Sequence, residues 1–179
     1  MKKLSNTAKL VIVLVVLAIV FLGLSIGSAF YSVDRTIKAI DSIDSVTYSE
    51  ESENKIDTAI KYYEKLDRNL KLDTKITNYY KLEQAKKDFV RITIKNAVVS
   101  DQRKIAENLS DNDIVAFILE VDEKAEKYLD AGELEQIENY EDLLNLKSKY
   151  SKLLESSSSE DSTGSEAGSE EGSDEVELC

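Results

Sequence analysis

Carboxylates are the most abundant groups in this 179-residue chain that could carry chemistry. Residues 155–179 hold nine of the 35 acids and no base, and Lys2, Lys3 and Lys9 are three of the 23 bases, so 26 acids and 20 bases remain for residues 31–154. Glycosidases use two carboxylates about 5–10 Å apart. So many acids produce such pairs by chance, and solvated helix faces account for them. No carboxylate is therefore predicted to be catalytic.

Other catalytic or metal-binding patterns are incomplete. Asp111-Asn112-Asp113 begins like a calcium loop, but the Gly at position six and the Glu at position twelve are missing, so a helix cap is the better interpretation. The chain has no His and one Cys, which excludes His triads and Cys/His zinc sites. Neither glycine-rich phosphate-binding motif occurs. We expect a protein that is not an enzyme and has no cofactor or metal.

Aromatic and thiol side chains are the remaining candidates for contacts with partners. Tyr62-Tyr63 and Tyr79-Tyr80 are adjacent pairs, so one member of each must point away from a helical core. Tyr62 and Tyr80 are therefore candidate exposed contacts for a peptide or carbohydrate, although packing at the core edge is the stronger interpretation. Cys179, the only thiol, is a candidate for an intermolecular disulfide in an oxidising environment.

Charge is distributed unevenly along the chain. The net charge of −12 excludes nucleic acid as a partner. Residues 155–179 are rich in Ser, Glu and Gly and offer almost no apolar surface to offset the entropy of ordering. They are predicted to form a disordered acidic tail that acts as a solvated spacer, with a docking tail or a set of phosphorylation sites as alternatives.

The region near the N-terminus is typical of a membrane anchor. Residues 10–30 carry no charge, and a helix of this length spans about 31 Å, close to the thickness of the hydrocarbon core. The lysines of residues 1–9 put that end in the cytoplasm and the bulk of the chain outside. The sequence predicts a single-pass signal-anchor in the cell membrane. Cleavage after Ala29 is the alternative, which the length of the apolar run disfavours.

Two glycines within the predicted anchor could bring membrane helices together. Gly23 and Gly27 are four residues apart, the small-xxx-small spacing that allows close helix packing. Glycine is also common in membrane helices that do not associate. Gly23 and Gly27 are therefore candidate positions for lateral association.

Apolar residues in 31–154 recur every three or four positions, which predicts helices. The third is expected to begin after Asp73 and either to run on or to break near Ser100; a cap at Ser110 starts the fourth. Ile92–Ile94 is the only strand candidate. Short connections imply antiparallel neighbours, so we expect an all-α bundle. The helices are expected at about 31–46, from Ser49 or Ser52 to Leu66, 73–92 or beyond, 110–129 and 134–154.

An internal similarity suggests two related helical units. ITNYYKLEQAKKDF, beginning at Ile76, can be laid on IENYEDLLNLKSKY, beginning at Ile137, without a gap. The offset of 61 pairs Asn78 with Asn139. A duplicated unit, with boundaries 31–93 and 94–154, is the economical explanation, and chance similarity of two amphipathic helices is the alternative.

Positions within the first unit form three short motifs: a V-T turn, A-x3-Y-x2-L and I-x-N-Y-x2-L-x2-A. In this order they resemble the three-helix modules of large exported cell-surface proteins of Gram-positive bacteria, well over residues 37–89 and poorly over 114–150. The resemblance implies a packing module without catalytic residues. No cell-wall sorting signal follows the tail, which implies display on the cell side of the wall. The positions that carry the resemblance are Ile40, Ile43, Val46, Thr47, Ile56, Ala59, Tyr63, Leu66, Ile76, Asn78, Tyr79, Leu82 and Ala85.

These features together predict a membrane-anchored, extracytoplasmic helical protein that acts by protein binding or scaffolding at the cell envelope. The expected partners are the lipid bilayer and other envelope proteins or a second copy of the chain. The alternative is a sensory or regulatory helical input module that signals by lateral association.

Overall fold

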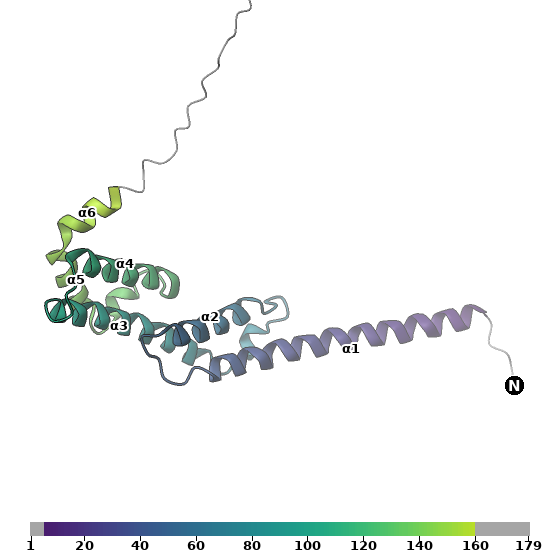
Figure 1. Cartoon of the computed structure of the whole chain (residues 1–179). Helices are drawn as coiled ribbons and strands as arrows, with labels where there is room; N and C mark the ends of the chain where they lie inside the picture. The colour runs from purple at the N-terminus through teal and green to yellow at the C-terminus, as the bar shows by residue number, and fades with distance from the viewer. Residues whose placement is uncertain (1–5, 160–179) are drawn as a thin grey trace, which may run out of the picture.

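The computed structural model describes residues 6–159, apart from the side chains of residues 6–12, 21–29 and 157–159. The described residues are helical with short connections and contain no strand, so the prediction of an all-α bundle is confirmed for them (Figure 1). The elements in order are α1 (Asn6–Asp41), α2 (Glu50–Glu64), η1 (Asp73–Lys75), α3 (Tyr79–Arg103), α4 (Asp111–Tyr128), η2 (Leu134–Gln136), α5 (Tyr140–Lys149) and α6 (Ser151–Ser159).

Helix α1 projects from the bundle as a single long helix (Figure 1). It is continuous from Asn6 to Asp41, so the apolar segment and the first helix of the bundle are one element. Large apolar side chains between Val13 and Val20 are 46–63% exposed. Among the residues open to this test, no helix is both long enough and apolar enough to cross a membrane. Residues 10–12 and 21–29 of the predicted anchor lie outside the described side chains.

The first three long helices form a layer next to the projecting part of α1. Helix α2 runs antiparallel to α1, with the ring of Tyr62 against Arg35. Helix α3 then runs parallel to α1, because Asn78 Nδ2 donates to the carbonyl oxygen of Ile37 (3.0 Å) at its start and Lys81 Nζ lies 2.6 Å from Asp41 Oδ1 one turn later.

The second half of α3 opens another three-helix layer with α4 and α5. Phe89 and Tyr128 meet edge to face with ring centres 5.8 Å apart. Asn139 Nδ2 donates to the carbonyl oxygen of Arg91 (3.0 Å) just before α5 begins. Helix α3, about 37 Å long at 1.5 Å per residue, is therefore shared between the two layers and sets their separation.

Two serine caps, 61 residues apart, start α2 and α4. Ser49 Oγ accepts from the backbone N–H of Ser52 (3.3 Å). Ser110 forms a reciprocal capping box with Asp113, whose carboxylate accepts from the Ser110 N–H (2.7 Å). Hydrogen bonds from the Ser110 hydroxyl and backbone lower the pKa of Asp113. The prediction of a helix cap at Ser110 is confirmed.

Several predicted helix boundaries are wrong for one shared reason. Asp73 and Leu134 each begin a 3-10 turn rather than a long helix, and α3 and α5 begin only at Tyr79 and Tyr140. After each turn Ile76 or Ile137 is extended, which drives its buried side chain into the core. Apolar spacing alone does not separate a 3-10 turn from the first turn of an α-helix.

The remaining boundaries differ in smaller ways. Helix α1 ends at Asp41 rather than Val46. Helix α3 passes Ser100 without a break and includes Ile92–Ile94, so the strand alternative is wrong. The last helix is divided at Tyr150, and α6 continues to Ser159, beyond the predicted start of the tail at residue 155. Residues 160–179 lie outside the described part of the chain.

Candidate functional site

An open groove of about 720 Å³ lies between the last turns of α1 and the exposed face of α2. Ala39 contributes apolar surface, and hydroxyl, amide and charged groups surround it. Its lining residues are Arg35, Lys38, Ala39, Ser42, Glu50, Glu51, Asn54, Lys55, Thr58 and Tyr62.

One end of the groove is closed by Arg35 and Tyr62. The guanidinium carbon of Arg35 lies 4.1 Å from the centre of the Tyr62 ring, and Arg35 Nη2 also donates to the Tyr62 hydroxyl. The stacking is a cation–π contact. Tyr62 is half-buried and lines the groove together with Arg35.

The other tyrosines separate into inward and outward members. Tyr63 and Tyr79 stack with ring centres 4.3 Å apart, which joins α2 to the start of α3. Burial raises the pKa of Tyr79, and its contact with Glu83 raises it further. Tyr80 points outward and is 68% exposed. The structure thus puts one member of each pair in the packed layer and leaves Tyr80 accessible on α3.

Two lysines along the groove form ion pairs within their own helices. Lys38 Nζ lies 2.7 Å from Asp34 Oδ2, and Lys55 Nζ lies 2.9 Å from Glu51 Oε1, both at a spacing of four residues. A hydrogen bond from Lys55 lowers the pKa of Glu51. Exposed pairs of this kind contribute little stability. Both lysines of the groove are therefore neutralised locally, whereas Arg35 contacts Tyr62 instead of a carboxylate.

A polar cluster links the two layers through α2 and α4. Lys124 Nζ lies 2.8 Å from Glu53 Oε1, and Lys127 Nζ lies 3.0 Å from the same oxygen. Tyr128 donates its hydroxyl to Asp57 Oδ1 (2.8 Å). Burial alone would raise the pKa of Glu53, but the two lysines outweigh it and lower the pKa.

None of the residues in this cluster is among the predicted site residues. Its signal was present, because Glu53 and Asp57 are four apart on one helix and Lys124 and Lys127 are three apart on another. Spacings of three or four put such charges on one helix face. The sequence does not show that these two helix faces lie against each other, because that depends on the tertiary fold. The cluster connects α2 of the first layer to α4 of the second.

A similar contact closes the far end of the bundle. Asp101 near the end of α3 accepts from the Tyr150 hydroxyl (2.5 Å) and from Lys149 Nζ (2.7 Å) at the end of α5. Burial alone would raise the pKa of Asp101, but the bonds from Lys149 and Tyr150 lower it. These two bonds hold the end of α5 against the end of α3.

The other candidate site residues, Gly23, Gly27 and Cys179, fall where the structure does not describe side chains. Gly23 and Gly27 lie in α1, within the stretch whose side chains are not described, and Cys179 lies outside the described residues. Among the residues that the structure describes, no group of three potential ligands could hold a metal ion.

The chain matches no protein-family model, and comparisons with curated proteins and with solved structures also give no match.

Proposed function

We propose that this chain is a single-pass, membrane-anchored scaffold of the cell envelope whose extracytoplasmic bundle binds another envelope protein or a second copy of itself. One observation carries the anchor: the exposed apolar side chains of α1 between Val13 and Val20. Successive helical residues are about 100° apart, so consecutive apolar residues cover every face of the helix. Transfer of each to an apolar environment is worth about 1.5–3 kcal/mol, which favours a bilayer over water.

The proposed scaffold has a direction. Helix α1 joins the anchor to the first layer without a break, and α3 carries the second layer farther from the anchor (Figure 1). We interpret the layers as two related units, supported by turns and serine caps that recur 61 residues apart. The groove between α1 and α2 is the binding surface nearest the membrane.

Labelling of Cys179 on intact cells tests the anchor and its orientation. A membrane-impermeant maleimide is expected to label the full chain before lysis. In the matched control, Ser5→Cys in a Cys179→Ser background, labelling is expected only after lysis. The reverse pattern would overturn the proposed topology. Recovery of the full-length chain of either variant in the soluble fraction would overturn the anchor itself.

Photocrosslinking in cells tests binding through the groove. A photoreactive residue at Asn54, which lines the groove, is expected to give a discrete adduct with a protein or with the chain itself. The control is the same residue at Asn112, an exposed position at the start of α4 and outside the groove. Equal adducts at both positions would remove the groove from the proposal.

A second candidate function is signalling by lateral association. The continuity of α1 favours it, because a change in bundle packing would reach Gly23 and Gly27 through one uninterrupted helix. Crosslinking of the chain in membranes, with and without Gly27→Leu, tests this. A dimer fraction unchanged by the substitution contradicts association through these glycines.

A further inference from the structure

The segment from the last turn of α2 through η1, residues 61–75, is unusually basic for this chain, and we refer to it as the basic loop. No base of the basic loop forms an ion pair with a described carboxylate. Bases on neighbouring helices differ: Lys38 and Lys81 lie 2.7 and 2.6 Å from their carboxylate partners. The basic residues of the loop are Lys61, Lys65, Arg68, Lys71 and Lys75.

The acids of the basic loop do not cancel this charge. The basic loop contains three acids, Glu64, Asp67 and Asp73, against five bases. Its net charge is therefore +2, although residues 31–154 as a whole are acidic. Asp67 is also occupied by the backbone: its Oδ1 accepts from the N–H groups of Asn69 (2.8 Å) and Leu70 (3.4 Å). The bases therefore remain available to an external anion.

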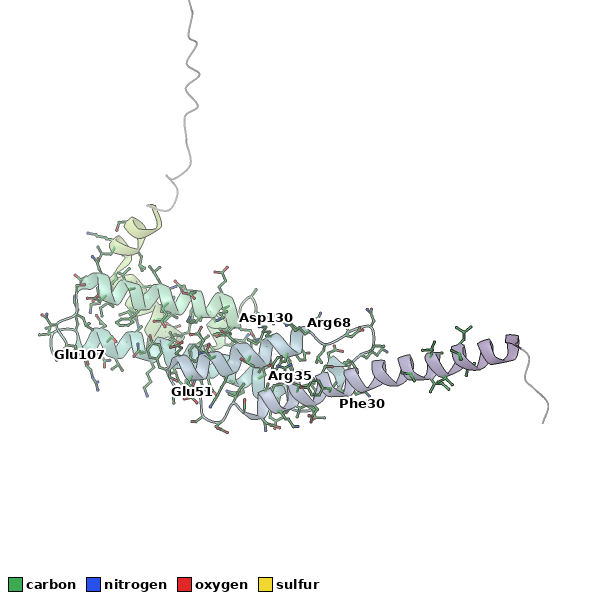
Figure 2. The ribbon with its side chains drawn as sticks, turned by 45° about the vertical axis from the view of Figure 1, so that its right-hand side comes forward. Phe30, Arg35, Glu51, Arg68, Glu107 and Asp130 are labelled. Carbon is green, nitrogen blue, oxygen red and sulfur yellow. The ribbon has the colours of Figure 1, made fainter. Side chains whose placement is uncertain are left out.

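The position of the basic loop follows from the direction of α2. Because α2 runs back along α1, with Tyr62 against Arg35, the residues after it lie toward the projecting part of α1. Figure 2 shows Arg68 at the end of the bundle near Phe30, whereas Glu107 lies at the opposite end. The basic loop thus lies at the end of the bundle from which the proposed anchor emerges.

Exposed apolar groups accompany the bases at this end. Leu70, at the tip of the turn, is 60% exposed, and Phe30 and Tyr31 on α1 are 72% and 65% exposed. Lys71 adopts a φ of 50°, which turns the chain sharply beside Leu70. Aromatic residues at the end of a span and bases around an apolar side chain are the composition that suits the boundary between headgroups and acyl chains.

We propose that the basic loop is a second membrane contact, which lays its cationic side chains on anionic phospholipid headgroups beside the point where α1 leaves the bilayer. Juxtamembrane bases are attracted to anionic lipid surfaces over about a Debye length. The inference rests on the proposed anchor, because the anchor holds the basic loop within that range. Its consequence is a fixed tilt of the first layer, with the groove between α1 and α2 presented at a constant angle to the membrane.

Fluorescence quenching in vesicles tests this contact with the full chain. A fluorophore is attached to Asn69→Cys in a Cys179→Ser background, and the matched control carries it at Ala106→Cys, in the turn at the far end. Vesicles contain a headgroup-linked quencher in phosphatidylcholine, with or without about 30% phosphatidylglycerol. In anionic vesicles we expect about three-fold stronger quenching at position 69 than at position 106, reduced about two-fold by Arg68→Ser with Lys71→Ser. Raising the salt from about 0.1 to 0.5 M should produce a similar loss.

The outcomes separate the two proposals. Chains that float with the vesicles but show equal quenching at positions 69 and 106 overturn the lipid contact and leave the anchor standing. Quenching at position 69 that is the same with and without phosphatidylglycerol overturns recognition of anionic headgroups. Chains that do not float overturn the anchor. Circular dichroism of each variant confirms that the helices are retained, so a lost signal reports the contact rather than unfolding.

Discussion

Asn78 and Asn139 form equivalent hydrogen bonds at the starts of α3 and α5. Each donates through Nδ2 to a backbone carbonyl of an earlier helix, Asn78 to Ile37 in α1 and Asn139 to Arg91 in α3, at 3.0 Å in both cases. Each also has a buried Oδ1 for which the described residues supply no hydrogen-bond partner. The amide is tolerated because its donor is satisfied, while the unpaired oxygen has a cost.

Replacing Asn78 by Asp should be much worse than replacing it by Ala. Asn78→Ala loses one hydrogen bond but also the unpaired oxygen, so we expect a loss of about 1 kcal/mol. Asn78→Asp places a carboxylate against the Ile37 carbonyl and near Asp41, and the loss at pH 7 should be about 3 kcal/mol. Thermal unfolding of the full chain in detergent measures both.

The pH dependence provides the control for that pair of substitutions. Burial raises the pKa of the introduced carboxyl, so its cost should shrink as the pH falls and the neutral form takes over. Asn69→Asp, in the exposed turn, should change stability little at any pH. A loss in Asn78→Asp that is independent of pH would contradict this account.

Glu53 should make stability depend on pH in the opposite sense. Its pKa in the folded protein is lowered from 4.5, so its contribution is complete above 4.5 and is lost as the pH falls through the folded pKa. We expect the melting temperature to fall with acid in that range and Glu53→Gln to reduce the fall. Glu126→Gln, an exposed position on α4, is the control and should leave the slope unchanged. A parallel slope in Glu53→Gln would show that the cluster does not contribute.

At the scale of elements, the start of α4 depends on its cap. Ser110 and Asp113 satisfy each other's backbone N–H groups, which would otherwise lack partners at a helix N-terminus. We expect Ser110→Ala to cost about 1 kcal/mol and to speed hydrogen exchange at the amide of Asp113. Ser45→Ala, in the exposed connection between α1 and α2, should have no effect. Unchanged exchange at Asp113 would contradict the importance of the cap.

The elements also show what the sequence could and could not predict. The cap at Ser110 was predictable because a side chain and its third neighbour form it alone. The 3-10 turns at Asp73 and Leu134 were not, because the extended conformation of Ile76 and Ile137 is set by the core that they enter. The stacking of Arg35 on Tyr62 was missed for a related reason: residues 27 apart meet only through antiparallel packing.

At the scale of the whole molecule, α3 should behave as a rigid spacer between the layers. Spin labels at Tyr80→Cys and Gln102→Cys in a Cys179→Ser background are separated by 22 residues, or a backbone distance of about 33 Å. Pulsed electron spin resonance should give one narrow distance distribution near this value in detergent and in vesicles. A broad distance distribution would instead support a break in α3 near Ser100.

The sharing of α3 between layers has a consequence for how such a chain could lengthen. Because α3 ends one layer and begins the next, no boundary separates the two layers. Adding a layer would therefore require inserting a whole 61-residue period. At this offset, Val90, Ile94 and Ala97 of α3 correspond to Ser151, Glu155 and Ser158 of α6. These hydrophilic residues provide no apolar surface against which a third layer could pack.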